Sequence, residues 1–341
     1  MANLTIRDIA KMAGVSTTAV SFVLNHRKGV SEQTRERVEA IIRQTGFTPN
    51  VHTRRLNLGR SFTIHVVLRR YSYSLFNQFA LEMLHGMFKA SKDLGYGIVF
   101  TFVEDQADWD QIVASVRSKD CDGVILNQIE DPTLIDILRQ EQMPFVCVDS
   151  HIRHDGSVPL VEVDYYNAAY QATSYLHRCG HQEIGFIGPK NPTEYYLSTF
   201  GGYTAALKDA KLVCNPAWMP EISFAESAAE NCINRLLQYP YLPTAFFCAG
   251  DSFAVDTIRC AKRRGLRIPE DISIVSLDDL LVSQYLDPPL STMTFDKELL
   301  GERAVQLLHK IIQHEPHEAV NLIPTRLVCR STVKDIRKQG E

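Results

Sequence analysis

Hydrophobic positions over residues 5–45 recur at the spacing of short helices. The first group lies three and four residues apart, on one helical face: Ile6, Ile9, Ala10 and Ala13. Thr5 and Asp8 have the spacing of a capping box at the start of this helix. Gly14 can end the helix, because glycine adopts the left-handed conformation without a steric penalty.

A second helix follows, and Ser16 stands at the position of its N-cap. Its inward positions are apolar: Ala19, Val20, Val23 and Leu24. Its outward positions are Thr17, Thr18, Ser21, Phe22 and Asn25. Two short helices around a turn that contains glycine predict a helix-turn-helix, whose second helix enters the major groove of DNA. A third helix is predicted over residues 32–44, capped by Ser31.

From residue 62 onward, apolar runs alternate with amphipathic stretches. The runs that predict strands lie at 62–68, 97–102, 123–126, 145–148, 160–163, 183–187, 244–248, 273–277 and 291–295. The predicted helices include 76–94, 108–119, 167–177, 203–210, 252–264 and 297–314. Alternation of this kind predicts parallel sheets covered by helices. The segment is too long for one compact sheet domain, so we expect an α/β core of two doubly wound parallel-sheet subdomains behind a small all-α head.

Charge separates the head from the rest of the chain. Residues 1–60 hold ten basic and four acidic residues, a net charge of +6, whereas the remainder carries −10. A basic module on an acidic body favours a polyanion such as DNA as the partner of the head.

Composition excludes several other classes of protein. Of 341 residues, 45% are hydrophobic and 22% are charged, as in an ordinary globular chain. No apolar run approaches the roughly 18 residues of a membrane span, and residues 1–10 lack the apolar stretch of a secretory signal. We therefore expect a cytoplasmic protein without a membrane partner. The eight cysteines form no CxxC pair, which indicates reduced core residues.

Motifs of catalysis and cofactor binding are missing from the sequence. No GxGxxG follows a predicted strand, and there is no GxSxG, P-loop or HExxH motif. Residues 151–155 (HIRHD) contain possible metal ligands but no cysteine partners. We expect no enzyme activity, no cofactor and no metal.

The ordered motifs of the head carry a specific resemblance. They are "TIRDIAKMAGVSTTAVSFVLN", "VSEQTRERVEAII", "GFTPN" and "RRLNLG". This run resembles the DNA-binding head of the lac repressor family. The resemblance implies a DNA-binding domain over residues 1–48 and a hinge over 49–60 that becomes helical on DNA. It also implies that Leu56 inserts as an apolar wedge into the minor groove.

Candidate DNA contacts follow from the helix-turn-helix and the resemblance. Thr17 and Thr18 are expected to point at base edges. Phe22 stands where relatives often carry a polar base-reading residue, and it could contact a thymine methyl group or pack internally. The other candidates, for phosphate contacts or for positioning of the head and hinge, are Thr5, Arg7, Ser16, Ser21, Asn25, Asn50, Arg54 and Arg55.

The body resembles the effector-binding core of the same family. The similar motifs are "CDGVIL", "RCGHQEIGFIGP", "GGYTAAL", "PTAFFCAGD" and "LRIPEDISIVSLDD". Such cores are similar to periplasmic sugar-binding proteins, in which crossing strands join two subdomains around a ligand cleft. The resemblance implies a core over 61–341, with one subdomain of 61–161 and 292–323 and another of 162–291 and 324–341.

The resemblance also indicates effector-binding residues. Asp278 matches an aspartate that hydrogen-bonds ligand hydroxyls or amines, although a helix-capping or loop acid without that role fits the residues too. Phe247 matches a lining segment, and Thr199 replaces an arginine that many relatives carry. The loop after the first strand supplies Arg69, Tyr73 and Phe76 as a third wall. We expect a small-molecule effector, a carbohydrate or carbohydrate derivative.

Together these features predict a sequence-specific transcription regulator, a repressor, whose operator affinity is modulated by the effector. A homodimer would read a near-palindromic operator of double-stranded DNA, one head on each half-site. Two alternatives stay open: a sugar-binding sensor without DNA-binding function, and an enzyme of the doubly wound class.

Overall fold

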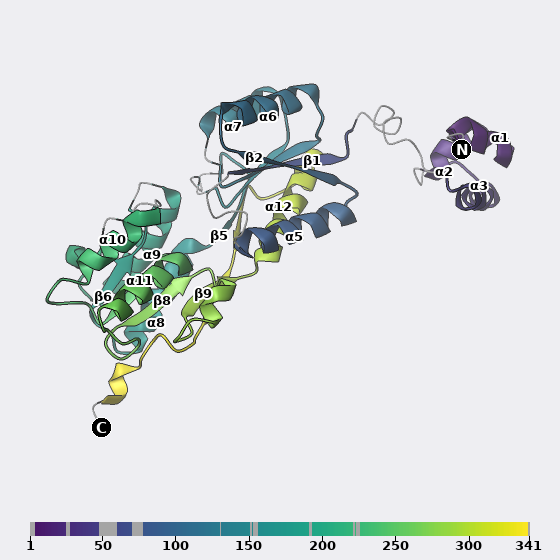
Figure 1. The fold of residues 1–341 in the computed structure, drawn as a ribbon. Helices are drawn as coiled ribbons and strands as arrows, with labels where there is room; N and C mark the ends of the chain where they lie inside the picture. The colour runs from purple at the N-terminus through teal and green to yellow at the C-terminus, as the bar shows by residue number, and fades with distance from the viewer. Residues whose placement is uncertain are drawn as a thin grey trace. The chain divides into compact units, whose positions relative to one another are not determined.

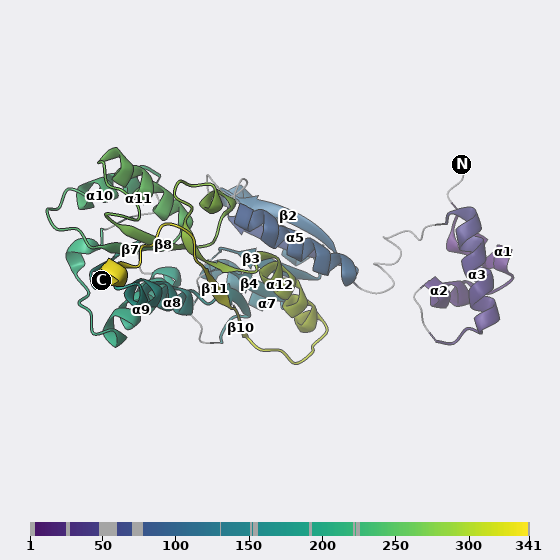
Figure 2. The same cartoon turned by 90° about the horizontal axis from the view of Figure 1, so that it is seen from below.

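The computed structural model describes residues 4–24, 28–47, 60–69, 78–129, 131–150, 152, 156–190, 193–220, 222 and 226–339. The chain divides into two compact units, Met1–Phe62 and Thr63–Glu341. Figures 1 and 2 show the first as a small helical head and the second as a larger α/β body. The predicted fold class is confirmed.

The head consists of α1 (Ile6–Ala13), α2 (Thr17–Leu24) and α3 (Glu32–Thr45). At the start of α1, the carboxylate of Asp8 accepts hydrogen bonds from the backbone N–H of Thr5 at 2.8 Å and from its hydroxyl at 2.7 Å. These bonds lower the pKa of Asp8. The three helices surround one apolar cluster, made of Ile9, Ala10, Ala13, Val20, Val23 and Val38.

The body contains two sheets (Figure 1). The first has the order β10-β5-β4-β3-β1-β2, with β1 (Thr63–Arg69), β2 (Gly97–Val103), β3 (Gly123–Asn127), β4 (Phe145–Val148), β5 (Leu160–Val163) and β10 (Val320–Ile323). The second has the order β11-β9-β8-β7-β6, with β6 (Ile184–Ile187), β7 (Ala245–Cys248), β8 (Ser273–Leu277), β9 (Ser291–Phe295) and β11 (Thr325–Val328). Neighbouring strands run parallel except β11 and β9, which are antiparallel.

Helices cover both sheets, as the alternation predicted. Those of the first subdomain are α5 (Gln78–Asp93), α6 (Gln106–Ser118), α7 (Pro132–Gln140) and α12 (Lys297–Ile312). Those of the second are α8 (Tyr165–Arg178), α9 (Glu194–Asp209), α10 (Glu226–Leu236) and α11 (Asp251–Arg263), with short 3₁₀ turns at η1 (Pro216–Trp218), η2 (Leu281–Gln284) and η3 (Ile336–Gln339). Helix α5 packs on α12, and α8 packs on α9.

The crossings between the subdomains differ from the expected boundaries at two points. Strand β5 pairs in the first sheet along its whole length, so the first crossing follows Val163 and not residue 161. Strand β9 pairs with β8 in the second sheet, so the second crossing follows Phe295 and not residue 291. The third crossing lies between β10 of the first sheet and β11 of the second. Backbone pairing sets these limits, and it cannot be read from apolar runs alone.

Several elements were not predicted. Helices α7 and α10 and strands β10 and β11 are additional, and α9 begins at Glu194 and not at residue 203. Strands β10 and β11 lie at the ends of the two sheets and are largely half-exposed, so they lack a continuous apolar run. Among the described residues, no helix combines the length and the apolarity needed to cross a membrane. Six cysteines are buried, whereas Cys329 is exposed.

Candidate DNA-reading head and effector site

The start of α2 presents hydroxyl groups to solvent. The Ser16 side chain accepts a hydrogen bond from the backbone N–H of Ala19 at 3.1 Å, and thereby caps the helix. Val20 and Val23 anchor the opposite face in the core. Thr17 and Thr18 are exposed in the first turn. This is the part of a recognition helix that reaches base edges in the major groove.

The other candidate DNA-contacting residues of the head that the structure describes differ in exposure and in their local contacts. Arg7 and Thr5 are exposed at the start of α1, where the Thr5 hydroxyl donates to Asp8. Ser21 is half-buried on α2. Phe22 was expected on the outer face but is half-buried, and a Cβ at Gly29 would lie only 3.1 Å from its ring. The ring therefore packs against the turn after α2, where Gly29 has no side chain.

Several candidates fall outside the described residues: Asn25, Asn50, Arg54, Arg55, Leu56, Tyr73 and Phe76. The backbone of Arg69 ends β1, but its side chain is not described. Most of the HIRHD stretch is also outside. Within the described part of the chain, no group of three His, Cys, Asp or Glu side chains could hold a metal ion.

Asp278 follows the last residue of β8 and is half-buried. Its backbone has a φ of 101°, and its N–H donates to the carbonyl of Met293 on β9 at 2.9 Å. Burial raises the pKa of Asp278 to about 7, and the nearby carboxylate of Asp251 adds to this rise, whereas Lys297 opposes it. A carboxyl group with this pKa at a strand end is a candidate binding residue.

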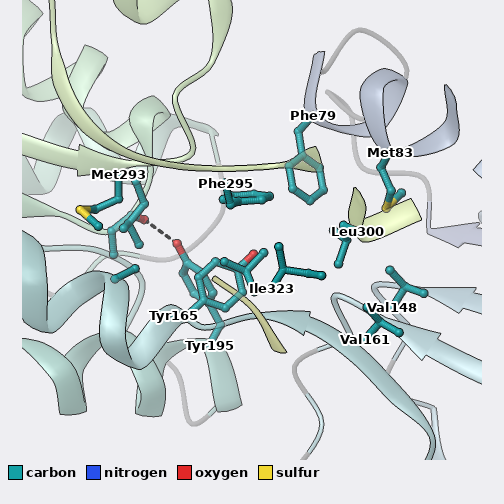
Figure 3. Packing of buried hydrophobic residues seen from close by; sticks show 14 of the residues in the cluster. Phe79, Met83, Val148, Val161, Tyr165, Tyr195, Met293, Phe295, Leu300 and Ile323 are labelled. Carbon is teal, nitrogen blue, oxygen red and sulfur yellow. Dashed lines mark hydrogen bonds between the residues drawn. The ribbon is translucent and has the colours of Figure 1, made fainter. Parts of the chain in front are cut away.

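Two buried tyrosines lie beside this region. The rings of Tyr165 and Tyr195 meet edge to face, with centroids 4.8 Å apart (Figure 3). The Tyr165 hydroxyl donates to the Asp149 carboxylate at 2.6 Å, and the Tyr195 hydroxyl donates to the carbonyl of Ala249 at 3.0 Å. Burial, together with nearby carboxylates that include Asp278, raises the pKa of both tyrosines well above the ordinary value.

Asp149 connects the two subdomains at this point. It follows β4 of the first sheet, whereas Tyr165 begins α8 of the second subdomain. Gln128 donates to the other oxygen of the Asp149 carboxylate at 2.9 Å. Sequence analysis missed Asp149, Tyr165 and Tyr195. The position of Asp149 directly after a predicted strand could have indicated it, because ligands bind beyond the carboxyl ends of strands.

The side chains of Phe247 and Thr199 do not line an open pocket, although the resemblance implied that they would. Both residues are fully buried. The Phe247 ring packs against Phe186, with centroids 5.8 Å apart, inside the apolar core. The Thr199 hydroxyl donates to the carbonyl of Tyr195 at 2.7 Å, one turn back in α9. Neither side chain therefore faces an open surface in this structure.

A cavity of about 430 Å³ lies where β9 crosses into α12. The first subdomain contributes Glu82, Lys297 and Glu298, the second contributes Asp279, Leu280, Leu281, Gln284 and Arg330, and the crossing contributes Thr294, Phe295 and Asp296. The ammonium of buried Lys297 lies 4.9 Å from the centre of the Phe295 ring. Asp279 and Arg330 form an ion pair at 2.7 Å. The cavity is polar and is bounded by both subdomains.

Known proteins match the head, the body and the whole chain. Residues 5–50 match the model of bacterial regulatory proteins of the lacI family, and residues 173–333 match a periplasmic binding protein-like domain. The HTH-type transcriptional repressor PurR of Haemophilus influenzae (strain PittEE) is 32% identical over 343 residues, which cover 97% of this chain and 99% of that protein.

Solved structures resemble the whole chain too. The complex of the transcriptional regulator CelR with cellobiose has a TM-score of 0.74 at 25% identity, over 96% of this chain and 99% of that one. The lac repressor dimer bound to operator and the anti-inducer ONPF has a TM-score of 0.79 at 24% identity, over 98% and 100%.

A helix-turn-helix head and a periplasmic-binding-protein-like core on one chain define a DNA-binding transcription regulator. The chain belongs to the lacI family of bacterial regulatory proteins. The matched relatives named above are transcription regulators, which favours this function over the sensor and enzyme alternatives.

Proposed function

We propose that this regulator is a repressor that binds a near-palindromic operator as a homodimer in the cytoplasm. A small-molecule effector at the junction of the two subdomains modulates its operator affinity. One observation carries the DNA-binding part of the proposal: Thr17 and Thr18 stand exposed on the first turn of a capped helix in a head of net charge +6.

The head supplies two kinds of contact to DNA. Thr17 and Thr18 read base edges, while Arg7, Arg54 and Arg55 meet phosphates and hold the register. Leu56 acts as the minor-groove wedge in the hinge, where an apolar side chain kinks the duplex and allows further contacts. One head reads one half-site, so two heads need a two-fold operator.

An exposed apolar surface on the body supports the homodimer. Leu81 and Phe88 on α5 are 57% and 60% exposed, and Phe100 on β2 is 41% exposed. Phe100 lies on the same face of the strand as Ile98 and Phe102, which pack on the α5 side of the sheet. We call Leu81, Phe88 and Phe100 the α5–β2 face; helix α5 contacts strand β2. Apolar side chains gathered in this way mark a surface for protein association. A second copy of the chain is the partner that a two-fold operator requires.

The chemistry around Asp278 favours an effector rich in hydroxyl groups. The hydroxyls of Tyr165, Tyr195 and Thr199 already donate to protein acceptors. Donors to the Asp278 carboxylate therefore come from the ligand, and Tyr73 or Phe76 would stack on its apolar ring face. A carbohydrate or carbohydrate derivative meets both needs. The relative CelR, solved with cellobiose, supports this class.

Footprinting tests the proposed function most simply. The full-length protein is incubated with DNA from around its own gene, at several salt concentrations. We expect a protected near-palindrome and an affinity that falls steeply with salt, because phosphate contacts release counterions. Binding without sequence preference, or no binding at any salt concentration, would refute the proposal.

A further inference from the structure

The carboxylate of Asp251 lies at the centre of a buried network next to Asp278. Asp251 begins α11 and is fully buried. One of its oxygens accepts hydrogen bonds from the hydroxyls of Ser276 and Thr292, and the other accepts from the Ser283 hydroxyl and the backbone N–H of Leu280. Four donors fill the hydrogen-bonding capacity of a carboxylate.

These donors come from three separate segments of the second subdomain. Ser276 is on β8 and Thr292 is on the crossing strand β9. Leu280 and Ser283 belong to the turn that follows Asp278. One side chain therefore ties the Asp278 turn to the strand that continues into the first subdomain.

The turn itself has a backbone that needs support. Asp278 and Asp279 have φ angles of 101° and 50°, which L side chains rarely adopt. Residues in such conformations persist where their surroundings hold them in place. The Leu280 N–H bond to Asp251, at 2.7 Å, holds the turn directly after these two residues. The Asp279–Arg330 ion pair holds it from the other side.

Asp251 also acts on Asp278 electrostatically. The Asp251 carboxylate raises the pKa of Asp278, whereas the Asp251 backbone lowers it. Gly250, directly before Asp251, has a φ of 123°, a conformation that favours glycine, and it lies beside the Asp278 carboxylate. The position and the ionisation of Asp278 therefore both depend on the residue that anchors the turn.

We propose that Asp251 is the positioning residue of the effector site: its carboxylate holds the turn that carries Asp278 and fastens this turn to β9. A change at Asp278 is thereby transmitted to the strand that leads into α12. The role of Asp278 in effector binding rests on the proposed function, but the coupling between Asp251, the turn and β9 does not.

Hydrogen exchange of the full-length protein, followed by mass spectrometry, tests the coupling without DNA or effector. In Asp251→Asn, we expect amides of 280–286 and 292–295 to exchange roughly tenfold faster or more, because hydrogen bonds to a charged group are lost. Thr257→Val is the matched control: it removes a buried hydroxyl that bonds Phe253 within α11. It should leave both segments unchanged. No change in Asp251→Asn, or the same acceleration throughout the second subdomain, would overturn the proposal.

The pH titration of Asp278 distinguishes a positioning role of Asp251 from a purely structural one, because a purely structural role would leave the midpoint of this titration unchanged. The titration is followed as the pH dependence of the melting-temperature difference between a chain that retains Asp278 and the same chain with the substitution Asp278→Asn. The Asp251→Asn background should shift its midpoint down by roughly one pH unit, since a neighbouring negative charge is removed. An unchanged or higher midpoint would contradict the coupling.

If Asp251→Asn does not fold, two variants that each remove one hydrogen-bond donor to Asp251 test the proposal instead. Thr292→Val removes the bond to β9, and Ser283→Ala removes a bond to the turn. Each should accelerate exchange in both segments, because the segments share one acceptor. Acceleration confined to the substituted segment would overturn the proposed connection. A failure of the footprinting experiment, by contrast, would refute the proposed function and leave these exchange results standing.

Discussion

The hydroxyl of Tyr165 donates a hydrogen bond of 2.6 Å to the carboxylate of Asp149, and this bond joins the two subdomains. Both residues are buried, at 5% and 1% exposure. Burial raises the pKa of Tyr165 well above its ordinary value, so the hydroxyl remains a donor at neutral pH. The contact gives the subdomain junction a specific polar connection within an apolar cluster.

Loss of this hydroxyl should lower the stability of the body. We expect Tyr165→Phe to reduce the free energy of unfolding by about 1–3 kcal/mol, because a buried carboxylate loses a donor. Tyr166→Phe is the control, since Tyr166 is 49% exposed on the next position of the same helix. Chemical denaturation of both variants measures the difference. Equal stability of the two variants would show that the bond contributes nothing.

Asp278 should make the stability of the protein depend on pH. Its pKa is raised to about 7 in the folded chain, above the ordinary value of 3.8. The folded state therefore holds a proton that the unfolded state releases, and stability falls as pH rises from about 4 to 7. We expect Asp278→Asn to melt close to the parent at pH 4 and several degrees above it at pH 8. A difference that is constant over this range would contradict the raised pKa.

The first turn of α2 should determine sequence discrimination. Thr17→Ala or Thr18→Ala should reduce the affinity ratio between operator and random DNA by roughly tenfold. This reduction is near the lower end of the range of effects for the loss of one base contact. Affinity for random DNA should change little, because neither threonine carries charge. Gln33→Ala, at an exposed position of α3, is the control for general effects on the head. Gel-shift titrations give both affinities. A proportional loss on both DNAs would exclude base reading by these threonines.

The α5–β2 face should hold two copies of the chain together. Phe88→Glu places a charge in the middle of an apolar contact, and we expect dissociation to monomers at micromolar concentration. Val213→Glu is the matched control, since Val213 is 76% exposed and lies in the second subdomain. Sedimentation velocity distinguishes the two forms. A dimeric Phe88→Glu variant would place the interface elsewhere, and a monomeric parent protein would remove the homodimer altogether.

Much of the fold could be predicted because its determinants are local. The second and third helices of the head begin directly after Ser16 and Ser31, as the capping positions of these serines indicate. Most strands of the body are continuous apolar runs. Asp278 could be selected from its place after a strand. The Asp251 network could not, because Ser276, Ser283 and Thr292 meet only after three segments have packed together. The packing of Phe22 likewise depends on Gly29 in the following turn.

Operator affinity with and without an effector tests the central claim, that one chain couples DNA binding to small-molecule binding. A thermal-shift panel of sugars, sugar phosphates and nucleosides identifies the compound, because a ligand of the native state raises the melting temperature. The ratio of operator dissociation constants with and without that compound is then measured for the parent and for Asp278→Ala. We predict a ratio that departs from one by roughly fivefold or more in the parent, and a ratio near one in Asp278→Ala. The same ratio in both proteins, or a ratio of one in the parent, would contradict the account.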